Sequence, residues 1–213
     1  MAICSDADWE AVLNWPLGRR DELLLSFRQR VFGSQLNNVA ACPNCSQQVE
    51  WNMDINRMIA GHPVQSRYFP VFTLEKPPYV IWFRLPNSRD FWGERAVTDA
   101  SRLVRNCIIA AEKKGKPHPA DQLPDTIIQL LEKEMEREDP SANLSFSLAC
   151  PECNHSWSAM LDVMNYVWIE IDVWAKRLLH EVLVLARAFG WSEHDILHMH
   201  PRRRQLYLEM LST

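Results

Sequence analysis

Glycine is scarce in this chain, with only six among 213 residues, and no low-complexity tract interrupts it. Disordered chains are poor in hydrophobic residues, whereas 47% of these residues are hydrophobic, enough to bury a sizeable core. The sequence also lacks a glycine-rich phosphate-binding loop, the Gly-x-Ser-x-Gly turn of serine hydrolases and the His-Glu-x-x-His motif of zinc proteases. These absences argue against disorder and against the enzyme classes that such motifs define.

An excess of positive charge is missing too. The chain has 23 Lys and Arg residues against 27 Asp and Glu, a net charge of −4, which argues against broad electrostatic binding to nucleic acid. The first ten residues lack the layout of a signal peptide, and the most apolar stretch, 163–191, contains seven ionisable side chains, too many for a transmembrane helix. We therefore expect a soluble, cytoplasmic protein with no membrane span, in which paired cysteines serve metal or redox chemistry more often than structural disulfides.

Cysteine, in contrast, is present in an informative pattern. Four of the six cysteines lie in two Cys-Pro-x-Cys segments, 42–45 and 150–153, and residues of alternating polarity beside each segment predict strands. A structural zinc site takes four ligands in a tetrahedron, and thiolate is a preferred ligand. Such a site is closed and cannot activate water. We therefore predict one structural zinc ion, or iron in its place, bound by Cys42, Cys45, Cys150 and Cys153.

Two other uses of these cysteines are less well supported. A thioredoxin-like redox pair opens a helix within a βαβ unit, whereas both pairs here adjoin predicted strands. Disulfides are disfavoured in a reducing compartment. The residue after the second cysteine of such a turn commonly takes a positive φ, which suits Asn154 and suits Ser46 less well. Cys107 falls on the apolar face of a predicted helix, where a core position is expected.

The expected fold class is α+β: a split Cys4 zinc ribbon with a mixed α/β insertion, flanked by N-terminal and C-terminal helices. The N-terminal helical segment is expected over 1–40, and the split ribbon over 41–56 and 144–164. The insertion is expected over 57–143, and the C-terminal helical segment over 165–213. In the insertion, a strand over 79–85 is expected to lead into a largely helical stretch that places five residues on one face: Val97, Ala100, Val104, Cys107 and Ala111.

Hydrophobic periodicity and helix-capping residues predict several helices. Hydrophobic residues that recur every three or four positions predict a long helix over 165–188, and the segment Ser-Glu-His-Asp at 192–195 predicts the capped start of a short one. Further helices are expected over 19–32, 124–137 and 201–212.

Two clusters near the C-terminus suggest chemistry, but each has a simpler explanation. His194 and His198 are four residues apart on one helical face, yet no third ligand accompanies them, so a solvated surface is favoured. Arg202, Arg203 and Arg204 begin the last helix, where an anion could bind. A salt-bridged surface is favoured there because acidic residues lie nearby.

Three features occur together in this chain: the paired Cys-Pro-x-Cys turns, the run from Trp168 to Glu181, and the ending formed by 190–197 and 201–208. Together they resemble the family of T-even-type phage baseplate hub assembly chaperones or baseplate proteins. The resemblance extends to the segment Phe83-Arg-Leu-Pro-Asn-Ser88 and is most specific in the C-terminal fifty residues.

The resemblance implies a role in building the baseplate of a contractile phage tail or of a phage-tail-like injection system, as an assembly chaperone or as a structural component. It implies baseplate or hub proteins as partners, and a place in the cytoplasm or in the finished virion or particle. The chain departs from the family at Ser46 and Asn154, where Gly is usual after the second cysteine, and at Met199-His-Pro201, where the family has Leu-Ser-Pro.

The residues and the resemblance together predict a non-enzymatic protein that binds other proteins. Nine Trp residues are unusually many for this length, and aromatic side chains beyond the needs of the core commonly anchor interfaces. The expected partner-binding residues are Trp174, Trp191, Arg203 and Arg204, with both arginines facing solvent. Two alternatives stay open: a zinc-ribbon nucleic-acid-binding adaptor, which needs a contiguous basic face, and an enzyme with a site in the insertion, which needs a deep polar pocket.

Overall fold

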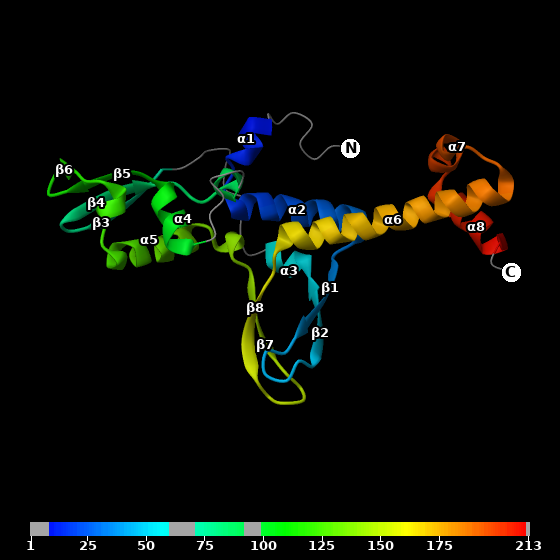
Figure 1. Cartoon of the computed structure of the whole chain (residues 1–213), viewed down its shortest axis with the longest axis horizontal. Coiled ribbons are helices and arrows are strands. Elements are labelled where there is room, and N and C mark those ends of the chain that lie inside the picture. Colours follow the sequence, from blue (N-terminus) through cyan, green and yellow to red (C-terminus); the bar gives the residue numbers. More distant parts are fainter. Residues whose placement is uncertain (1–8, 60–70, 92–98, 212–213) are drawn as a thin grey trace. The chain divides into compact units, whose positions relative to one another are not determined.

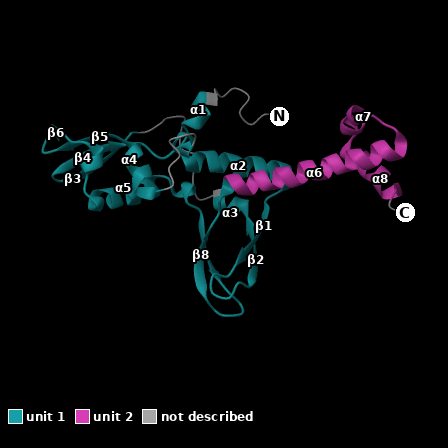
Figure 2. Ribbon diagram, viewed as in Figure 1, with its two compact units in different colours: residues 1–163 teal, residues 164–213 magenta. Residues whose placement is uncertain are grey.

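The computed structural model describes residues 9–59, 71–91 and 99–211, and these form helices and antiparallel sheets (Figure 1). The chain divides into two compact units, residues 1–163 and 164–213, coloured separately in Figure 2. Each unit is described by itself below.

The first unit opens with two helices, α1 (Trp9–Leu13) and α2 (Leu17–Phe32). Helix α2 begins two residues before the predicted start because Pro16, with φ −51°, suits the position just ahead of a helix. Gly33 ends it at φ 93°, a conformation that a residue with a side chain rarely adopts. At the start of α2, the Gly18 N–H donates to the Asp139 carboxylate at 3.0 Å, which satisfies one of the free amides of the first turn.

Gly18 lies too close to this partner for any larger residue. A methyl group there would overlap the Asp139 carboxylate and stand 2.9 Å from the Ala142 backbone nitrogen. We expect Gly18→Ala to lower the free energy of unfolding by about 2 kcal/mol, because overpacking outweighs the gain of about 1 kcal/mol from replacing Gly in a helix. Urea unfolding measures the loss. Ser26→Ala, on the same helix, is the control and should stay within about 0.5 kcal/mol of wild type; a variant Gly18→Ala as stable as this control would contradict the prediction.

Two antiparallel hairpins follow, far apart in the sequence. Strands β1 (Gln35–Ala41) and β2 (Gln48–Asp54) form the first, and β7 (Ser145–Ala149) and β8 (Ser156–Met160) the second. Strand β1 starts inside the segment 1–40 that was expected to be helical, because residues at every second position, Leu36 among them, turn inward.

The first hairpin ends at Asp54. Ile55 falls inside the range 41–56 expected for the ribbon, but it begins the short helix α3 (Ile55–Ile59) and is completely buried. Its N–H donates to the Ser34 carbonyl oxygen at 2.9 Å, a bond that ties the end of the hairpin back to its beginning.

The insertion between the hairpins contains a four-stranded antiparallel sheet in the order β3-β4-β5-β6. The strands are β3 (Phe72–Lys76), β4 (Tyr79–Phe83), β5 (Ile108–Lys113) and β6 (Lys116–Pro117). The helical segments are η1 (Ser88–Phe91), α4 (Ala100–Cys107), η3 (Ala120–Gln122), α5 (Asp125–Glu138) and η4 (Pro140–Ala142). Helices α4 and α5 lie beside the sheet (Figure 1) and share one hydrophobic core with it. Ile81, Phe83, Cys107 and Leu131 are almost completely buried in this core.

The predicted helical stretch is confirmed over Ala100–Cys107 and is wrong beyond it, up to Ala111. Helix α4 ends at Cys107, and Ile108 continues into a strand paired with β4. Two adjacent β-branched residues, Ile108 and Ile109, favour this change, and the open edge of β4 supplies the hydrogen bonds. Val97, expected on the same helical face, lies outside the described residues. The predicted helix over 124–137 is confirmed as α5.

The second unit contains most of α6 (Val163–Phe189), together with α7 (Glu193–His198) and α8 (Pro201–Leu211). The predicted cap is confirmed: the Ser192 hydroxyl oxygen accepts a hydrogen bond from the Asp195 N–H at 3.2 Å. Leu185 and Ile196 are completely buried. Among the described residues, no helix is both long enough and apolar enough to cross a membrane.

Candidate metal centre

Each Cys-Pro-x-Cys segment forms the turn of one hairpin, and the same backbone hydrogen bonds recur in both turns. In the first turn, the Cys42 N–H donates to the Gln47 carbonyl oxygen at 2.8 Å, and the Ser46 N–H donates to the Cys42 carbonyl oxygen at 2.9 Å. In the second turn, equivalent bonds of Cys150 and Asn154 are both 2.9 Å long. Two distant segments therefore fold into the same local structure.

The residue after the second cysteine takes a positive φ in both turns, as predicted. The angle is 61° at Ser46 and 55° at Asn154. This left-handed conformation redirects the chain after that residue, so that the Gln47 and His155 carbonyl oxygens accept hydrogen bonds from the N–H of the first cysteine of their turns. Asn adopts it more readily than Ser, which makes the first turn the more strained of the two.

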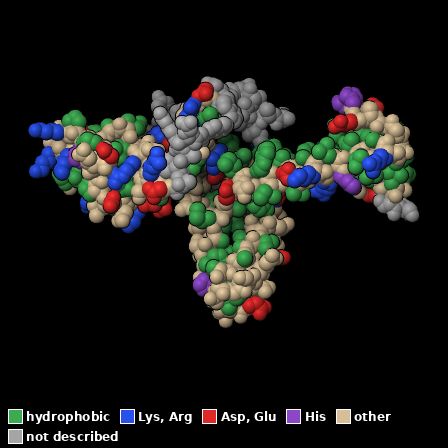
Figure 3. Space-filling view, viewed as in Figure 1, with side chains coloured by type: hydrophobic (Ala, Val, Ile, Leu, Met, Phe, Trp, Pro, Cys, Tyr) green, Lys and Arg blue, Asp and Glu red, His purple; other side chains and the backbone are tan. Residues whose placement is uncertain are grey.

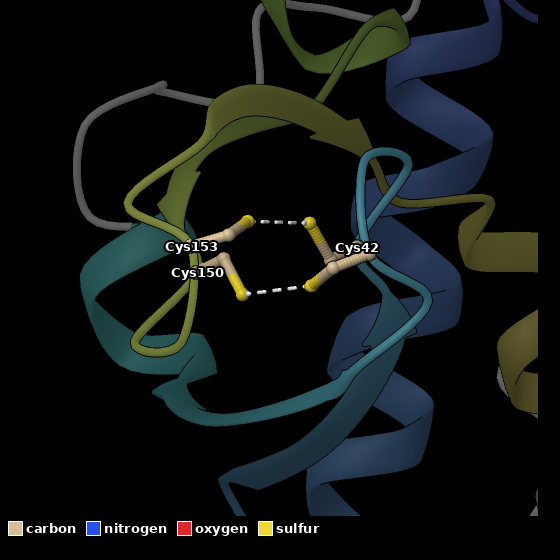
Figure 4. Close-up of side chains that lie close together, drawn as sticks. Cys42, Cys150 and Cys153 are labelled. Atoms are coloured by element: carbon tan, nitrogen blue, oxygen red, sulfur yellow. Dashed lines mark hydrogen bonds between the residues drawn. The ribbon is translucent and has the colours of Figure 1, made fainter.

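The two turns bring four thiol groups together (Figure 4). The Sγ atoms of Cys42 and Cys153 are 3.7 Å apart, those of Cys45 and Cys150 are 3.6 Å apart, and all four lie within 4.8 Å of one another. Sulfurs about 2.3 Å from a tetrahedral zinc ion are about 3.8 Å apart, whereas the sulfurs of a disulfide are about 2.0 Å apart. The spacing therefore fits four thiolates around one ion, and these cysteines could hold a metal.

The four cysteines differ in exposure in the same way in each turn. Cys42 and Cys150, the first cysteines, are each 1% exposed, whereas Cys45 is exposed and Cys153 half-buried. An ion bound here would be held from the protein interior by one pair of sulfurs and reached from solvent past the other pair.

The two outer thiols have opposite tendencies to ionise. Hydrogen bonds from the Asn44 side chain and then from the His155 backbone lower the pKa of Cys153 to about 6. A backbone hydrogen bond at Gln47 favours the Cys45 thiolate, but the neighbouring thiols, Cys153 first, raise its pKa to about 12. One thiolate thus suppresses the next, and a cation would favour all of them by removing the repulsion. Asn44 was not among the predicted site residues, although a polar residue between the two cysteines was the available signal.

The predicted partner-binding tryptophans lie in different surroundings. Trp191 stacks on Phe189 with ring centroids 4.5 Å apart and meets Tyr207 edge-on at 4.8 Å. It is half-buried in this aromatic cluster, which joins the end of α6 to α8. Trp174, in contrast, is 46% exposed and lines a groove between α6 and α8.

The expectation that both arginines face solvent is wrong for one of them. The Arg203 guanidinium is exposed and lies 5.7 Å from the centre of the Tyr207 ring. The Arg204 side chain is only 11% exposed, and its Nε is 2.8 Å from an oxygen of Glu181. Arg204 therefore joins α8 to α6, because its charge is paired within the unit.

His194 and His198, the other candidate metal ligands, lie together on α7. The rings of His194 and His198 stack with centroids 3.9 Å apart, and the His198 ring bonds the His194 carbonyl oxygen through Nδ1. Within the described ranges, only the four-cysteine cluster brings together three or more side chains that could hold a metal ion. Among these same residues, His194 and His198 have no third ligand beside them.

Comparison with known proteins identifies the family. The sequence model of the family described as T4 bacteriophage base plate protein matches residues 1–165. The match covers both cysteine turns and the whole of the first unit, and the chain therefore belongs to this family. The C-terminal fifty residues, which we expected to carry the most specific resemblance, lie almost entirely outside the match. Neither the curated proteins nor the solved structures contain a match.

Proposed function

We propose that this chain is a non-enzymatic protein that builds a contractile-tail baseplate by binding other baseplate or hub proteins, as an assembly chaperone or as a structural component. The family match over residues 1–165 carries this proposal. The place of action is the cytoplasm during assembly, or the virion or phage-tail-like particle once the protein is incorporated.

Within that role, we assign the cysteine cluster one structural zinc ion, which makes the two hairpins halves of a split zinc ribbon. The sulfur spacing of 3.6 and 3.7 Å supports four thiolate ligands. A zinc ion with four protein ligands has no open coordination position and acts by holding chain segments together. Here it joins hairpins between which the whole insertion lies, so the metal fixes both ends of that insertion.

The enzyme alternative gains little from the insertion. Cys107, its buried thiol, lies 3.6 Å from the Arg84 guanidinium, which would favour a thiolate. Burial nevertheless raises the pKa of Cys107 to about 12. The thiol therefore stays protonated at neutral pH, and a protonated, buried thiol is a poor nucleophile.

The nucleic-acid alternative has one feature in its favour. Lys and Arg side chains gather over the β5–β6 end of the sheet in Figure 3, where Lys113, Lys114 and Lys116 are exposed. Glu112 lies next to Lys113 on β5, and Glu75 lies on β3 of the same sheet, which limits this positive patch. Patches of a few surface lysines bind nucleic acid weakly and without sequence preference, so we favour the protein-binding role.

Deletion of the gene, with complementation from a plasmid, tests the proposed function. We expect the deletion to abolish complete baseplates in electron micrographs of purified particles, and the wild-type gene to restore them. Mass spectrometry of the restored particles then separates the two forms of the role, because a structural component stays in the particle and a chaperone does not. Normal numbers of complete particles in the deletion strain would exclude a required role in assembly.

A further inference from the structure

A groove lies between α6 and α8, entirely within the second unit. It encloses about 420 Å³, and the lining residues used below are Trp174, Arg177, Leu178, Glu181, Arg202 and Arg204. All of them lie in the part of the chain that the family match leaves uncovered, so the family provides no function for this groove. Figure 3 shows hydrophobic side chains next to Lys and Arg side chains over this unit.

The charges in the groove do not balance. Glu181 is paired with Arg204 at 2.8 Å, and both side chains are largely shielded from solvent. Arg177 and Arg202 are exposed, and within the described residues neither guanidinium forms an ion pair. The groove therefore presents two unpaired positive charges around one neutralised pair.

The groove also offers an apolar surface beside those charges. Trp174 is 46% exposed and lies one helical turn before Arg177, and the half-buried Leu178 also lines the groove. Exposed Trp next to Arg is the composition typical of the residues that dominate binding energy at protein interfaces. A ligand that fits this surface carries negative charge and an apolar group close together.

We propose that the α6–α8 groove binds an acidic segment of a partner protein, with carboxylates paired to Arg177 and Arg202 and an apolar side chain against Trp174. The inference deepens the proposed function and rests on it for the partner, which is then another baseplate protein. Carboxylate is favoured over nucleic-acid phosphate because Glu181 stands in the groove and only two guanidinium groups are unpaired. A phosphate backbone is bound by longer rows of cations.

Binding of a labelled peptide to the purified full chain tests the groove. The probe is a fluorescein-labelled peptide, Glu-Glu-Leu-Phe-Glu-Glu, and the comparison probes are Lys-Lys-Leu-Phe-Lys-Lys and a labelled oligothymidine. We expect fluorescence anisotropy to show binding of the acidic peptide alone, weakened by added salt. In the double variant Arg177→Glu and Arg202→Glu, affinity should fall by about tenfold or more, since each close ion pair becomes a repulsion.

The control is a double variant of equal net charge, Arg57→Glu and Arg187→Glu, whose exposed arginines do not line the groove. It should bind the acidic peptide within about twofold of wild type. Trp174→Ala should weaken binding without changing its salt dependence, because it removes apolar contact and no charge. Circular dichroism checks that each variant is folded.

Three results would overturn the proposal: no binding of the acidic peptide, equal loss in the control variant, or stronger binding of oligothymidine through the same arginines. A dimer in light scattering that only the groove variant dissociates would identify a second copy of this chain as the occupant instead. Failure of peptide binding would reject the groove as a binding site without contradicting the proposed baseplate role. Normal particles in the deletion strain would remove that role and leave peptide binding unaffected.

Discussion

Replacement of Cys150 by Ser is expected to cause the largest loss of stability of any single change in this chain. Cys150 is 1% exposed, and its Sγ lies 3.6 Å from that of Cys45 on the other hairpin. Structural zinc contributes about 10 kcal/mol or more to the folding of small zinc fingers. The larger core here offsets part of that, so we expect a loss of at least about 4 kcal/mol in unfolding free energy.

Metal analysis and chelation test the same prediction without a mutation. Freshly purified protein should contain about one zinc per chain, because one four-cysteine cluster offers one closed site. A chelator should lower the melting temperature of wild type and leave that of Cys150→Ser nearly unchanged. Cys107→Ala is the matched control: it also removes a buried sulfur, but it should keep the metal and the response to chelator. Protein free of zinc and iron, or equal melts with and without chelator, would contradict a structural metal.

Acid should release the metal as well. The proposed ligands are thiolates, for which protons compete with the ion, so metal affinity should fall as the pH is lowered. The stabilisation provided by the metal is therefore present at neutral pH and lost on acidification. Zinc content after dialysis at pH 8 and at pH 5 should show the difference, with most of the metal lost at the lower pH.

The sequence predicted the cysteine cluster because its geometry is local. Two residues between cysteines make a tight turn, and both turns adopt the expected positive φ, at Ser46 and at Asn154. To bring the two turns together, the fold then needs only to place the two ends of the insertion close to each other. The long helix and the cap at Ser192 were predictable for the same reason, since period and capping chemistry lie within a few residues.

Features that depend on distant partners were missed. The segment 108–113 has alanines and an apolar pattern that also suit a helix, and only pairing with β4 makes it a strand. Likewise, Arg204 in sequence is one of three adjacent arginines, and only the fold shows that it pairs with Glu181 whereas Arg202 does not. Choosing among equivalent arginines requires the packing of α8 on α6, which no local pattern contains.

Replacement of Asp90 by Ala should be the most damaging change within the insertion. The Asp90 carboxylate is bonded to both terminal nitrogens of Arg84, at 2.6 and 2.8 Å, and accepts the Asn87 N–H at 2.9 Å. Hydrogen bonding to this carboxylate raises the pKa of Arg84 above its ordinary value. Arginine is basic enough to stay charged without this partner, so removal of Asp90 leaves a partly buried positive charge unpaired. The segment also reaches α2, because the Leu17 N–H donates to the Pro86 carbonyl oxygen at 3.1 Å.

The expected loss is about 2–4 kcal/mol in unfolding free energy, below the full value for a buried ion pair because the Arg84 side chain is 33% exposed. Asp90→Asn keeps the volume and one acceptor oxygen, so it should lose about half as much. The control is Asp125→Ala, which breaks the ion pair between Asp125 and Arg105. The Asp125 side chain is 89% exposed, so this change should cost about 1 kcal/mol at most. Urea unfolding followed by tryptophan fluorescence compares the three variants. If Asp90→Ala costs no more than Asp125→Ala, the buried pair does not hold this segment in place.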